Sequence, residues 1–325
     1  MAVPYSRYLF GALPWYSFLI VLGAALAIWL AVREEKRTDF PKDTVLDFAL
    51  WALPCGIIGA RLYYVIFSWS EFRGDLLSIL RVWEGGIAIY GAVIAGLLTA
   101  WIFCRCRKIS FLQLCDLVAP GLILAQAIGR WGNYFNQEAY GRLITDPALC
   151  FFPFAVLIQT SSGAEWHMAT FFYESLWNFL VFLFLIIARR KLFRYRGDVF
   201  CFYAFLYACG RLVIEDFRMD SLYAASSVRV SQLLSLLICL GVFVRYFILF
   251  RSEGSLRFSG KLLPAVLAVL YDLGMLPLML GWISVSSLSL RFILLLSCSL
   301  LNILGFVLLY VACAKGEVIY ADIKE

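Results

Sequence analysis

The chain has 325 residues, of which 63% are hydrophobic and only 15% are charged, and its net charge is +6. A soluble domain of this length cannot bury so much apolar surface, and large apolar patches exposed to water aggregate. The composition therefore excludes an ordinary soluble enzyme and indicates an integral membrane protein. A transmembrane β-barrel is not expected, because the apolar runs are continuous and do not alternate with polar residues.

Nine stretches of the chain are long and apolar enough to cross a bilayer as helices, since a span needs roughly 20 apolar residues. The predicted spans are 14–32, 47–68, 87–104, 111–128, 170–188, 198–215, 229–250, 262–285 and 292–314. The first span is followed by Arg33, Lys36 and Arg37, whereas a cleavable signal peptide carries its charge before the apolar run, so we expect the span to be retained. The sequence thus predicts an all-α, polytopic transmembrane helix bundle.

Basic residues predict the orientation of this bundle, because cytoplasmic loops carry more lysine and arginine. One side of the predicted topology holds 18 of the 28 basic residues, including all seven lysines, and the other side holds ten arginines. We therefore expect the N-terminus outside and the C-terminus in the cytoplasm. The lack of lysine outside follows either from chance, since arginine outnumbers lysine 21 to 7, or from a need for forked recognition of phosphate or carboxylate.

The ten cysteines predict neither a disulfide framework nor a metal site. Most of them fall within or at the ends of predicted spans, and no CxxC pair occurs. We expect no metal and no bound organic cofactor. The positive net charge is explained by the loops of a membrane protein and calls for no nucleic acid partner.

The densest polar cluster follows the fourth predicted span and reads GRWGNYFNQEAYGR at residues 129–142. Polar groups at a membrane boundary each need a partner, and this mixture of forked cations, amides and aromatics suits a phospholipid headgroup. An aromatic belt at the interface explains the tryptophan and the tyrosines. It does not explain Asn133, Asn136 and Glu138 together, so we expect a functional role.

The longest outer segment, 129–169, begins with this cluster. It is too polar to span the membrane and too long for a tight connection, so we expect a small cap over the outer face. The only histidine of the chain, His167, lies in this segment and is expected to be a solvated loop residue.

Two further clusters lie near the same predicted boundary. The run WEGGIAIYGAVIAG at 83–96 contains four glycines, which either pack helices closely or admit a ligand, and Tyr90 lies among them. The run YACGRLVIEDFR at 207–218 carries Arg211 and Glu215 four residues apart on one helix face, either as a structural ion pair or as a phosphate contact.

Smaller polar groups at the starts of the first and fifth spans converge on the same boundary. Tyr16 opens the first span, and Tyr173-Glu174-Ser175 opens the fifth. Each group is weak evidence alone. Together with the three clusters, they indicate a polar site near the outer face.

The clusters together resemble the prolipoprotein diacylglyceryl transferases of bacteria. GRWGNYFNQEAYG (129–141) looks like that family's diagnostic motif, WEGGIAIYGAVIAG (83–96) like its glycine-rich motif, and GRLVIEDFR (210–218) like its late arginine–glutamate motif. The resemblance covers roughly residues 10–250 and implies a seven-span transferase core at 1–250. It says nothing about 251–325, which we expect to form a two-helix membrane extension.

The resemblance implies that the diacylglyceryl group of phosphatidylglycerol is transferred to the lipobox cysteine thiol of a preprolipoprotein. The products are a thioether-linked lipid and glycerol 1-phosphate, and the reaction is the first step of lipoprotein maturation in the bacterial cytoplasmic (inner) membrane. The residues suit this chemistry, because guanidinium groups stabilise negative charge as it develops on a leaving phosphate. The nucleophile is the thiolate, so deprotonation of the thiol must be assisted.

The resemblance also implies roles by motif position. Arg130 and Arg211 bind or polarise the phosphate, and Glu215 orients Arg211. The remaining expected substrate-binding residues are Asn133, Asn136, Glu138, Gly141, Tyr16 and Tyr207. Some family members have histidine where this chain has Tyr90, and a free tyrosine side chain, with its pKa near 10, is a poor base. Tyr90 is therefore expected to hydrogen-bond or position a substrate, and the base is left unassigned.

Two other classes of membrane protein compete with this interpretation. A lipid or solute transporter predicts inverted repeats and broken helices near the midplane, whereas no internal repeat is evident here. A scaffold protein does not require a polar set on one face such as Arg130, Asn133, Glu138 and Arg211. In the extension, Asp272 is either a functional acid or a paired structural one.

Overall fold

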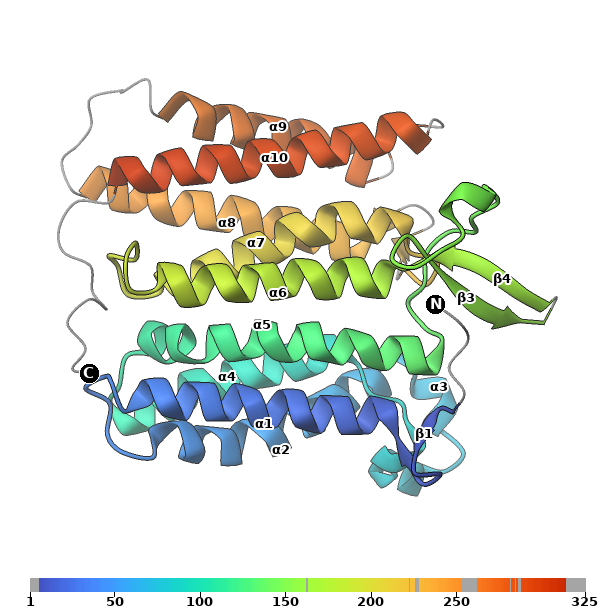
Figure 1. Ribbon diagram of the computed structural model, residues 1–325. Coiled ribbons are helices and arrows are strands. Elements are labelled where there is room, and N and C mark those ends of the chain that lie inside the picture. The colour runs from blue at the N-terminus through green and yellow to red at the C-terminus, as the bar shows by residue number, and fades with distance from the viewer. Residues whose placement is uncertain are drawn as a thin grey trace. The chain divides into compact units, whose positions relative to one another are not determined.

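The computed structural model describes residues 6–161, 163–221, 223–225, 228–252, 262–280, 282–283, 285 and 288–313. Its long helices are α1 (Trp15–Glu35), α2 (Thr44–Phe67), α4 (Ile89–Arg107), α5 (Phe111–Asn136), α6 (Thr170–Ala188), α7 (Asp198–Ile214), α8 (Val230–Ser252), α9 (Leu263–Met279) and α10 (Leu288–Cys313) (Figure 1). In this part of the chain, each predicted span overlaps one of these helices. The expected all-α helix bundle is confirmed.

Short elements connect the long helices. They are α3 (Trp69–Phe72) and the 3₁₀ turns η1 (Leu76–Leu80), η2 (Val82–Glu84), η3 (Pro147–Leu149) and η4 (Glu215–Phe217). Three antiparallel strand pairs complete the described elements: β1 (Tyr8–Leu9) with β2 (Leu13–Pro14), β3 (Ala155–Thr160) with β4 (Gly163–Met168), and β5 (Tyr223–Ala225) with β6 (Val228–Arg229).

Seven helices of the described chain are long and apolar enough to cross a membrane. The helix α7, with 17 residues, is not among them, and α9 is a shorter apolar helix. The span predicted at 262–285 is longer than α9, which ends at Met279, two residues after Pro277. Lys261, Lys315 and Lys324, which entered the orientation argument, lie outside the described residues.

The chain divides into two compact units. Among the described residues, the first contains those up to Ala27 and those from Ala119 to Cys313, and the second contains Ile28–Val118. The predicted boundary between a core and an extension at residue 250 stays a prediction.

In the second unit, α2 and α4 pack closely through small residues. A Cβ on Gly59 would clash with Ala95, and one on Gly91 would meet the backbone of Ala60 at 2.9 Å. These glycines therefore bring two helix backbones together, as one of the two interpretations of the glycine-rich run proposes. Arg61 of α2 is buried, and its guanidinium donates to the carbonyl oxygens of Ile79 and Gly86 at 2.9 and 2.8 Å, which ties the segment between α3 and α4 to α2.

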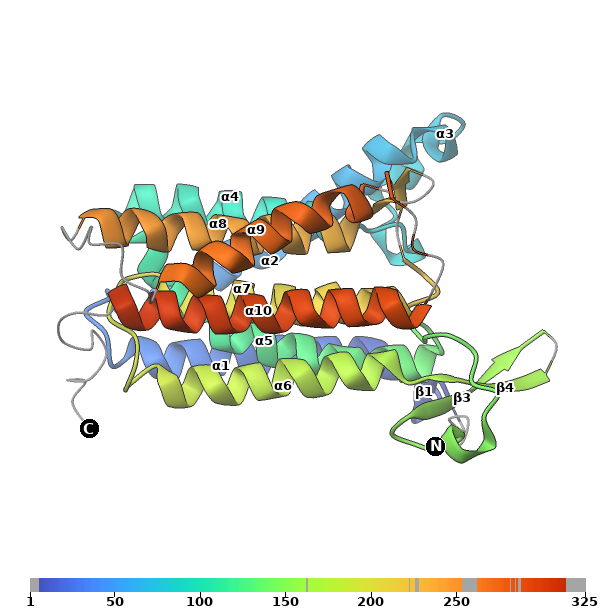
Figure 2. The ribbon, with the colours of Figure 1, turned by 90° about the horizontal axis from the view of Figure 1, so that it is seen from above.

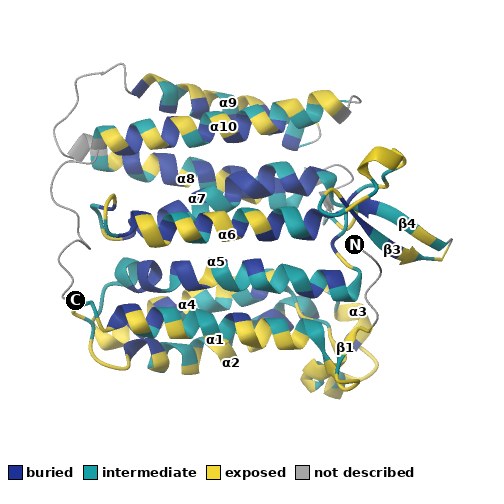
Figure 3. Cartoon of the chain, viewed as in Figure 1, coloured by how far each residue is buried: buried dark blue, intermediate teal, exposed yellow. Residues whose placement is uncertain are grey.

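In the first unit, α7 lies in the middle of a group of helices and packs against α6, α8 and α10 (Figures 1 and 2). Figure 3 shows buried residues along much of α7, whereas α1 and α2 carry many exposed residues. The side chains of Phe205, Phe243 and Phe306, from α7, α8 and α10, are fully buried and contact one another. The helix α7 is strongly buried because other helices pack against it on several sides.

The segment expected to form a cap, 129–169, begins with a helical part that was not predicted from the sequence. Residues 129–136 continue α5, so the first part of the polar motif is helical. The helix ends where Gln137 and Ala139 adopt positive φ angles of 55° and 53°. The helix continues this far because the aromatic side chains of the motif keep a helical spacing and are packed: Trp15 of α1 stacks on Phe135, with ring centroids 4.8 Å apart.

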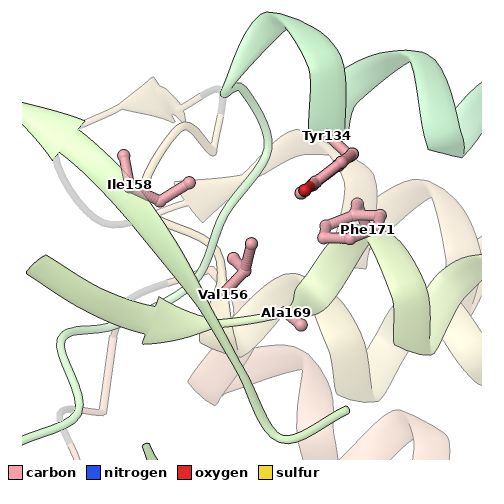
Figure 4. Packing of buried hydrophobic residues seen from close by; sticks show 5 residues of the cluster. All are labelled: Tyr134, Val156, Ile158, Ala169 and Phe171. Carbon is pink, nitrogen blue, oxygen red and sulfur yellow. The ribbon is translucent and has the colours of Figure 1, made fainter. Parts of the chain in front are cut away.

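The hairpin β3–β4 projects from the bundle beside the ends of α5 and α6 (Figure 1). Its root is held by a cluster of buried apolar residues, shown in Figure 4: Tyr134, Val156, Ile158, Ala169 and Phe171. The expectation of a solvated His167 was wrong. The His167 side chain is buried in this region, and its Nδ1 lies 2.8 Å from the carbonyl oxygen of Gly141, because strand pairing turns the ring inward.

Candidate functional site

Glu174, near the start of α6, is the centre of a buried charge cluster in the first unit. Its side chain is only 2% exposed. One carboxylate oxygen lies 2.6 Å from Nη2 of Arg130, on α5. The other lies 2.8 Å from Nη1 of Arg211, on α7, and 3.8 Å from Nη1 of Arg218. A buried carboxylate is costly to desolvate unless it is paired, and here three arginines from different segments share it.

Arg211 also binds Glu215, as the i, i+4 spacing predicts. The Nη2 group of Arg211 donates to the Glu215 carboxylate, while Nη1 donates to Glu174. Two carboxylates bound to separate nitrogens of the guanidinium fix its plane, because the fork geometry of arginine is rigid. We call Glu174, Glu215, Arg130, Arg211 and Arg218 the Glu174 cluster.

Arg218 extends the Glu174 cluster toward Asp220. Its Nε and Nη2 donate to the two carboxylate oxygens of Asp220 at 2.9 and 2.6 Å. Burial raises the pKa of Asp220, but the hydrogen bonds and charge of Arg218 outweigh it and hold the pKa below its ordinary value. The pair is bidentate, which is the strong geometry for such contacts.

Two tyrosines of the expected site lie around Arg130. Tyr207 of α7 accepts a hydrogen bond from the Arg130 guanidinium. Tyr16, at the start of α1, interacts electrostatically with both Arg130 and Glu138. A Cβ on Gly132 would lie 2.6 Å from the Tyr16 ring, so glycine at this position of α5 is what admits the tyrosine.

The expected headgroup residues of the motif lie at the end of α5. Asn136 accepts a hydrogen bond from Nε of Arg7 at 2.9 Å. The carbonyl oxygen of Asn133 accepts from the backbone N–H of Glu138 at 2.9 Å, which closes the helix end. Asn133 and Asn136 are half-buried, and Glu138 is exposed. The structure thus brings the motif together with the Glu174 cluster through Arg130, while the motif's amides lie at its more accessible end.

Gly141 lies where three segments meet. A Cβ on this residue would lie 2.7 Å from Cβ of Met168, 2.8 Å from Cγ2 of Thr170 and 3.0 Å from the carbonyl oxygen of Phe217. Such distances are too short for any side chain, so the close approach expected at Gly141 is present. It brings the cap and the start of α6 against the turn η4.

Tyr90 belongs to the second unit, in the first turn of α4. Its ring lies 6.4 Å from that of Tyr63 on α2, measured between centroids. Its expected part in the reaction stays a prediction.

A second charge cluster surrounds Asp216, the residue after Glu215. The Asp216 side chain is fully buried, and three arginines approach it from separate segments. Nη1 of Arg229 lies 2.8 Å and Nε of Arg291 2.7 Å from Oδ1, and Nη2 of Arg142 lies 3.4 Å from Oδ2. We call Asp216, Arg142, Arg229 and Arg291 the Asp216 cluster.

Sequence reasoning did not assign a role to Glu174 or to Asp216. A signal for Glu174 was available, since an ionisable residue inside a predicted span indicates a paired or functional group. Its partners on α5 and α7 lie 44 and 37 positions away in the chain, so no local spacing in the sequence predicts the contact. Asp216 was hidden because it stands beside Glu215 in a run that already held an i, i+4 pair.

The Glu174 cluster can stabilise an anion. Arg130, Arg211 and Arg218 have side chains that are 21%, 11% and 12% exposed, so none of the three is completely enclosed. Their positions are fixed by carboxylates before any ligand binds. Cations arranged in advance in a site of low dielectric stabilise developing negative charge more strongly than mobile ones, because they need no reorganisation during a reaction.

Comparison with known proteins identifies relatives over most of the chain. The family described as prolipoprotein diacylglyceryl transferase matches residues 7–248. The chain is 45% identical over 250 residues to a phosphatidylglycerol–prolipoprotein diacylglyceryl transferase of Enterococcus faecalis, which covers 76% of this chain and 90% of that protein. A protein with the same name from Streptococcus suis is 44% identical over 246 residues, which cover 75% of this chain and 90% of that protein. A third, from Listeria monocytogenes, is 47% identical over 226 residues, which cover 69% of this chain and 81% of that protein.

Proposed function

We propose that this chain, which belongs to the prolipoprotein diacylglyceryl transferase family, is a membrane-bound transferase. It moves the diacylglyceryl group of phosphatidylglycerol onto a prolipoprotein. Its described part holds seven helices that are able to cross a membrane. The observation that carries this proposal is the Glu174 cluster, whose arginines come from two of the family-like motifs. A solute transporter or a scaffold gives no reason for this arrangement within a matched transferase sequence.

In the reaction, the thiolate of the lipobox cysteine attacks a glycerol carbon of the lipid, forming the carbon–sulfur bond. The bond between that carbon and the phosphate oxygen breaks, and its electron pair stays on glycerol 1-phosphate. We assign Arg130 and Arg211 to the leaving phosphate, because their guanidinium groups, held by Glu174, can stabilise the extra negative charge that forms on it. Glu174 and Glu215 hold the two guanidiniums in place.

The substrate-binding roles of the remaining residues follow from their places around Arg130. Tyr207 and Tyr16 line the Arg130 side of the cluster. Asn133, Asn136 and Glu138, at the end of α5, are assigned to the headgroup, and Gly141 to the close approach that shapes this end of the site. Tyr90 is assigned to positioning a substrate by hydrogen bonding.

The protein is a multi-pass membrane protein, and we place it in the bacterial cytoplasmic membrane. The N-terminus is assigned to the outside, the C-terminus to the cytoplasm and the active site to the outer face. The excess of lysine and arginine on the opposite side supports this orientation. We assign the reaction to residues 1–250, which the family match nearly covers, with 251–325 as a membrane extension.

Transfer of labelled diacylglycerol from phosphatidylglycerol vesicles to a synthetic lipobox peptide tests the function. The wild type is compared with Arg130→Lys, with a peptide carrying serine in place of cysteine, and with Arg73→Lys, which alters an exposed arginine elsewhere. We expect transfer that needs the thiol, falls at least about 100-fold in Arg130→Lys and is unchanged in Arg73→Lys. Folded wild type without transfer contradicts the function, and equal rates for the two lysine variants contradict the role of Arg130.

A further inference from the structure

The helix α10 lies beyond the family match, which ends at residue 248, yet it is built into the first unit. Its residues Leu295, Phe306 and Leu309 are at most 1% exposed. The hydroxyl of Ser299 donates to the carbonyl oxygen of Cys209, on α7, at 3.1 Å. The two views in Figures 1 and 2 both show α10 running beside α7 and α8.

One end of α10 is fixed by a tyrosine. The Tyr310 hydroxyl lies 2.7 Å from Oδ2 of Asp198, at the start of α7, and donates to the carbonyl oxygen of Leu192 at 2.9 Å. The Tyr310 ring also packs edge-on against Phe202. These contacts lie at the opposite end of α7 from Arg211.

The other end of α10 reaches the turn η4. Nε of Arg291 lies 2.7 Å from Oδ1 of Asp216, and its Nη2 lies 3.5 Å from Oε1 of Gln232 on α8. The next residue, Phe292, packs against Phe217, with ring centroids 5.2 Å apart. Two consecutive residues of α10 therefore hold two consecutive residues of η4.

The turn η4 also carries Glu215, whose carboxylate binds Arg211. Because Glu215, Asp216 and Phe217 are consecutive in one 3₁₀ turn, a shift of Asp216 also shifts Glu215. The Arg211 guanidinium is held on that side by Glu215 and on the other by Glu174. A contact made by α10 is thus linked to Arg211 through η4, which Arg142 and Arg229 also hold.

We propose that Arg291, on α10, is a positioning residue for the transfer reaction. Arg291 holds η4 and, through Glu215, sets the orientation of Arg211. The inference rests on the proposed function. It goes beyond that function because it makes part of the segment after residue 250 necessary for full catalytic rate. A displacement of reacting groups by about 1 Å can lower a rate by 10²-fold, so loss of this contact has a measurable effect.

The test measures kcat and KM for phosphatidylglycerol, together with Tm, in Arg291→Gln, Arg291→Lys and Tyr310→Phe of the full-length chain. Arg291→Gln is expected to lower kcat about tenfold with KM changed less than threefold, and Arg291→Lys, which keeps a cation, to restore part of kcat. Tyr310→Phe is the matched control, since it removes a polar contact at the far end of α10. It is expected to lower Tm while kcat stays at the wild-type value.

The inference is overturned if Arg291→Gln keeps the wild-type kcat, or if Arg291→Gln and Tyr310→Phe lower kcat equally, because α10 then acts only through stability. If Arg291→Gln does not fold, Phe292→Leu decides: it loosens the contact with Phe217 and keeps the ion pair. A threefold lower kcat in Phe292→Leu supports the inference, and an unchanged kcat overturns it. Absence of transfer in the wild type is a separate result, which removes the proposed function instead.

Discussion

The Glu174 cluster and the Asp216 cluster both consist of carboxylates and arginines, but in different proportions. Each has a buried carboxylate shared by three arginines. In the first, Glu215 and Asp220 add further carboxylates that bind Arg211 and Arg218. In the second, the ion pairs among the described residues give the three arginines one carboxylate in common, that of Asp216.

This difference indicates different tasks. In the Glu174 cluster, added carboxylates hold the planes of the arginines, and such a fixed arrangement of cations suits an anion-binding site. In the Asp216 cluster, the arginines come from the cap, from β6 and from α10, and they converge on one turn. That arrangement suits a junction between segments. A buried carboxylate is costly unless it is paired, so the segments that carry its partners are held together.

The largest expected effect is the loss of transfer on replacing Glu174 by glutamine. Glutamine has nearly the same shape but no charge, so Arg130 and Arg211 lose their shared counter-ion and repel each other. We expect kcat to fall about 10²- to 10³-fold, the range seen on loss of one oriented electrostatic group in an active site. The control is Glu165→Gln, on the hairpin, whose side chain is 36% exposed. A wild-type rate in Glu174→Gln would remove the Glu174 cluster from the reaction.

Asp216→Asn should act on stability more than on the chemical step. It leaves three arginines around a buried neutral group, and breaking a buried ion pair costs about 3–5 kcal/mol. We expect a clearly lower Tm in detergent, with a smaller fall in kcat than in Glu174→Gln for protein that remains folded. If kcat instead falls as far as in Glu174→Gln while Tm is unchanged, the two clusters share one task and the comparison breaks down.

The smallest expected effect concerns Asp220, at the edge of the Glu174 cluster. Its pKa is lowered in the folded protein, mainly by Arg218 against the opposing effect of burial. A lowered folded pKa means that the pair stabilises the protein above the unfolded pKa, about 3.9, and that this contribution is lost as the pH falls through the folded pKa. Because the Asp220 side chain is 48% exposed, we expect only about 0–1 kcal/mol.

Thermal unfolding of wild type and Asp220→Asn across pH measures this contribution. The difference in Tm should be small and constant at neutral pH and should shrink as the pH falls below about 4. A difference that grows on acidification has the opposite sign and contradicts the lowered pKa. High salt should also reduce the difference, since exposed pairs are screened.

Much of the fold was available from sequence because lipid imposes simple rules. Continuous apolar runs must form helices in a bilayer, where unpaired backbone groups are costly, and each predicted span falls on a described helix. The pairing of Arg211 with Glu215 was predictable because it is local. Helix ends were less predictable: the run at 129–136 reads as a polar loop, yet it continues α5 because its aromatic residues pack against other segments.

The sequence by itself determined the membrane class, the helices, the family-like motifs and the arginines expected to meet a phosphate, because these depend on composition and on residues near one another in the chain. Only the tertiary structure decided that Glu174 joins Arg130 to Arg211, that His167 is buried, and that Arg291 reaches Asp216. Those contacts join segments far apart in sequence. A buried charge takes its partner from whichever helix packing brings beside it, and no spacing along the chain encodes that choice.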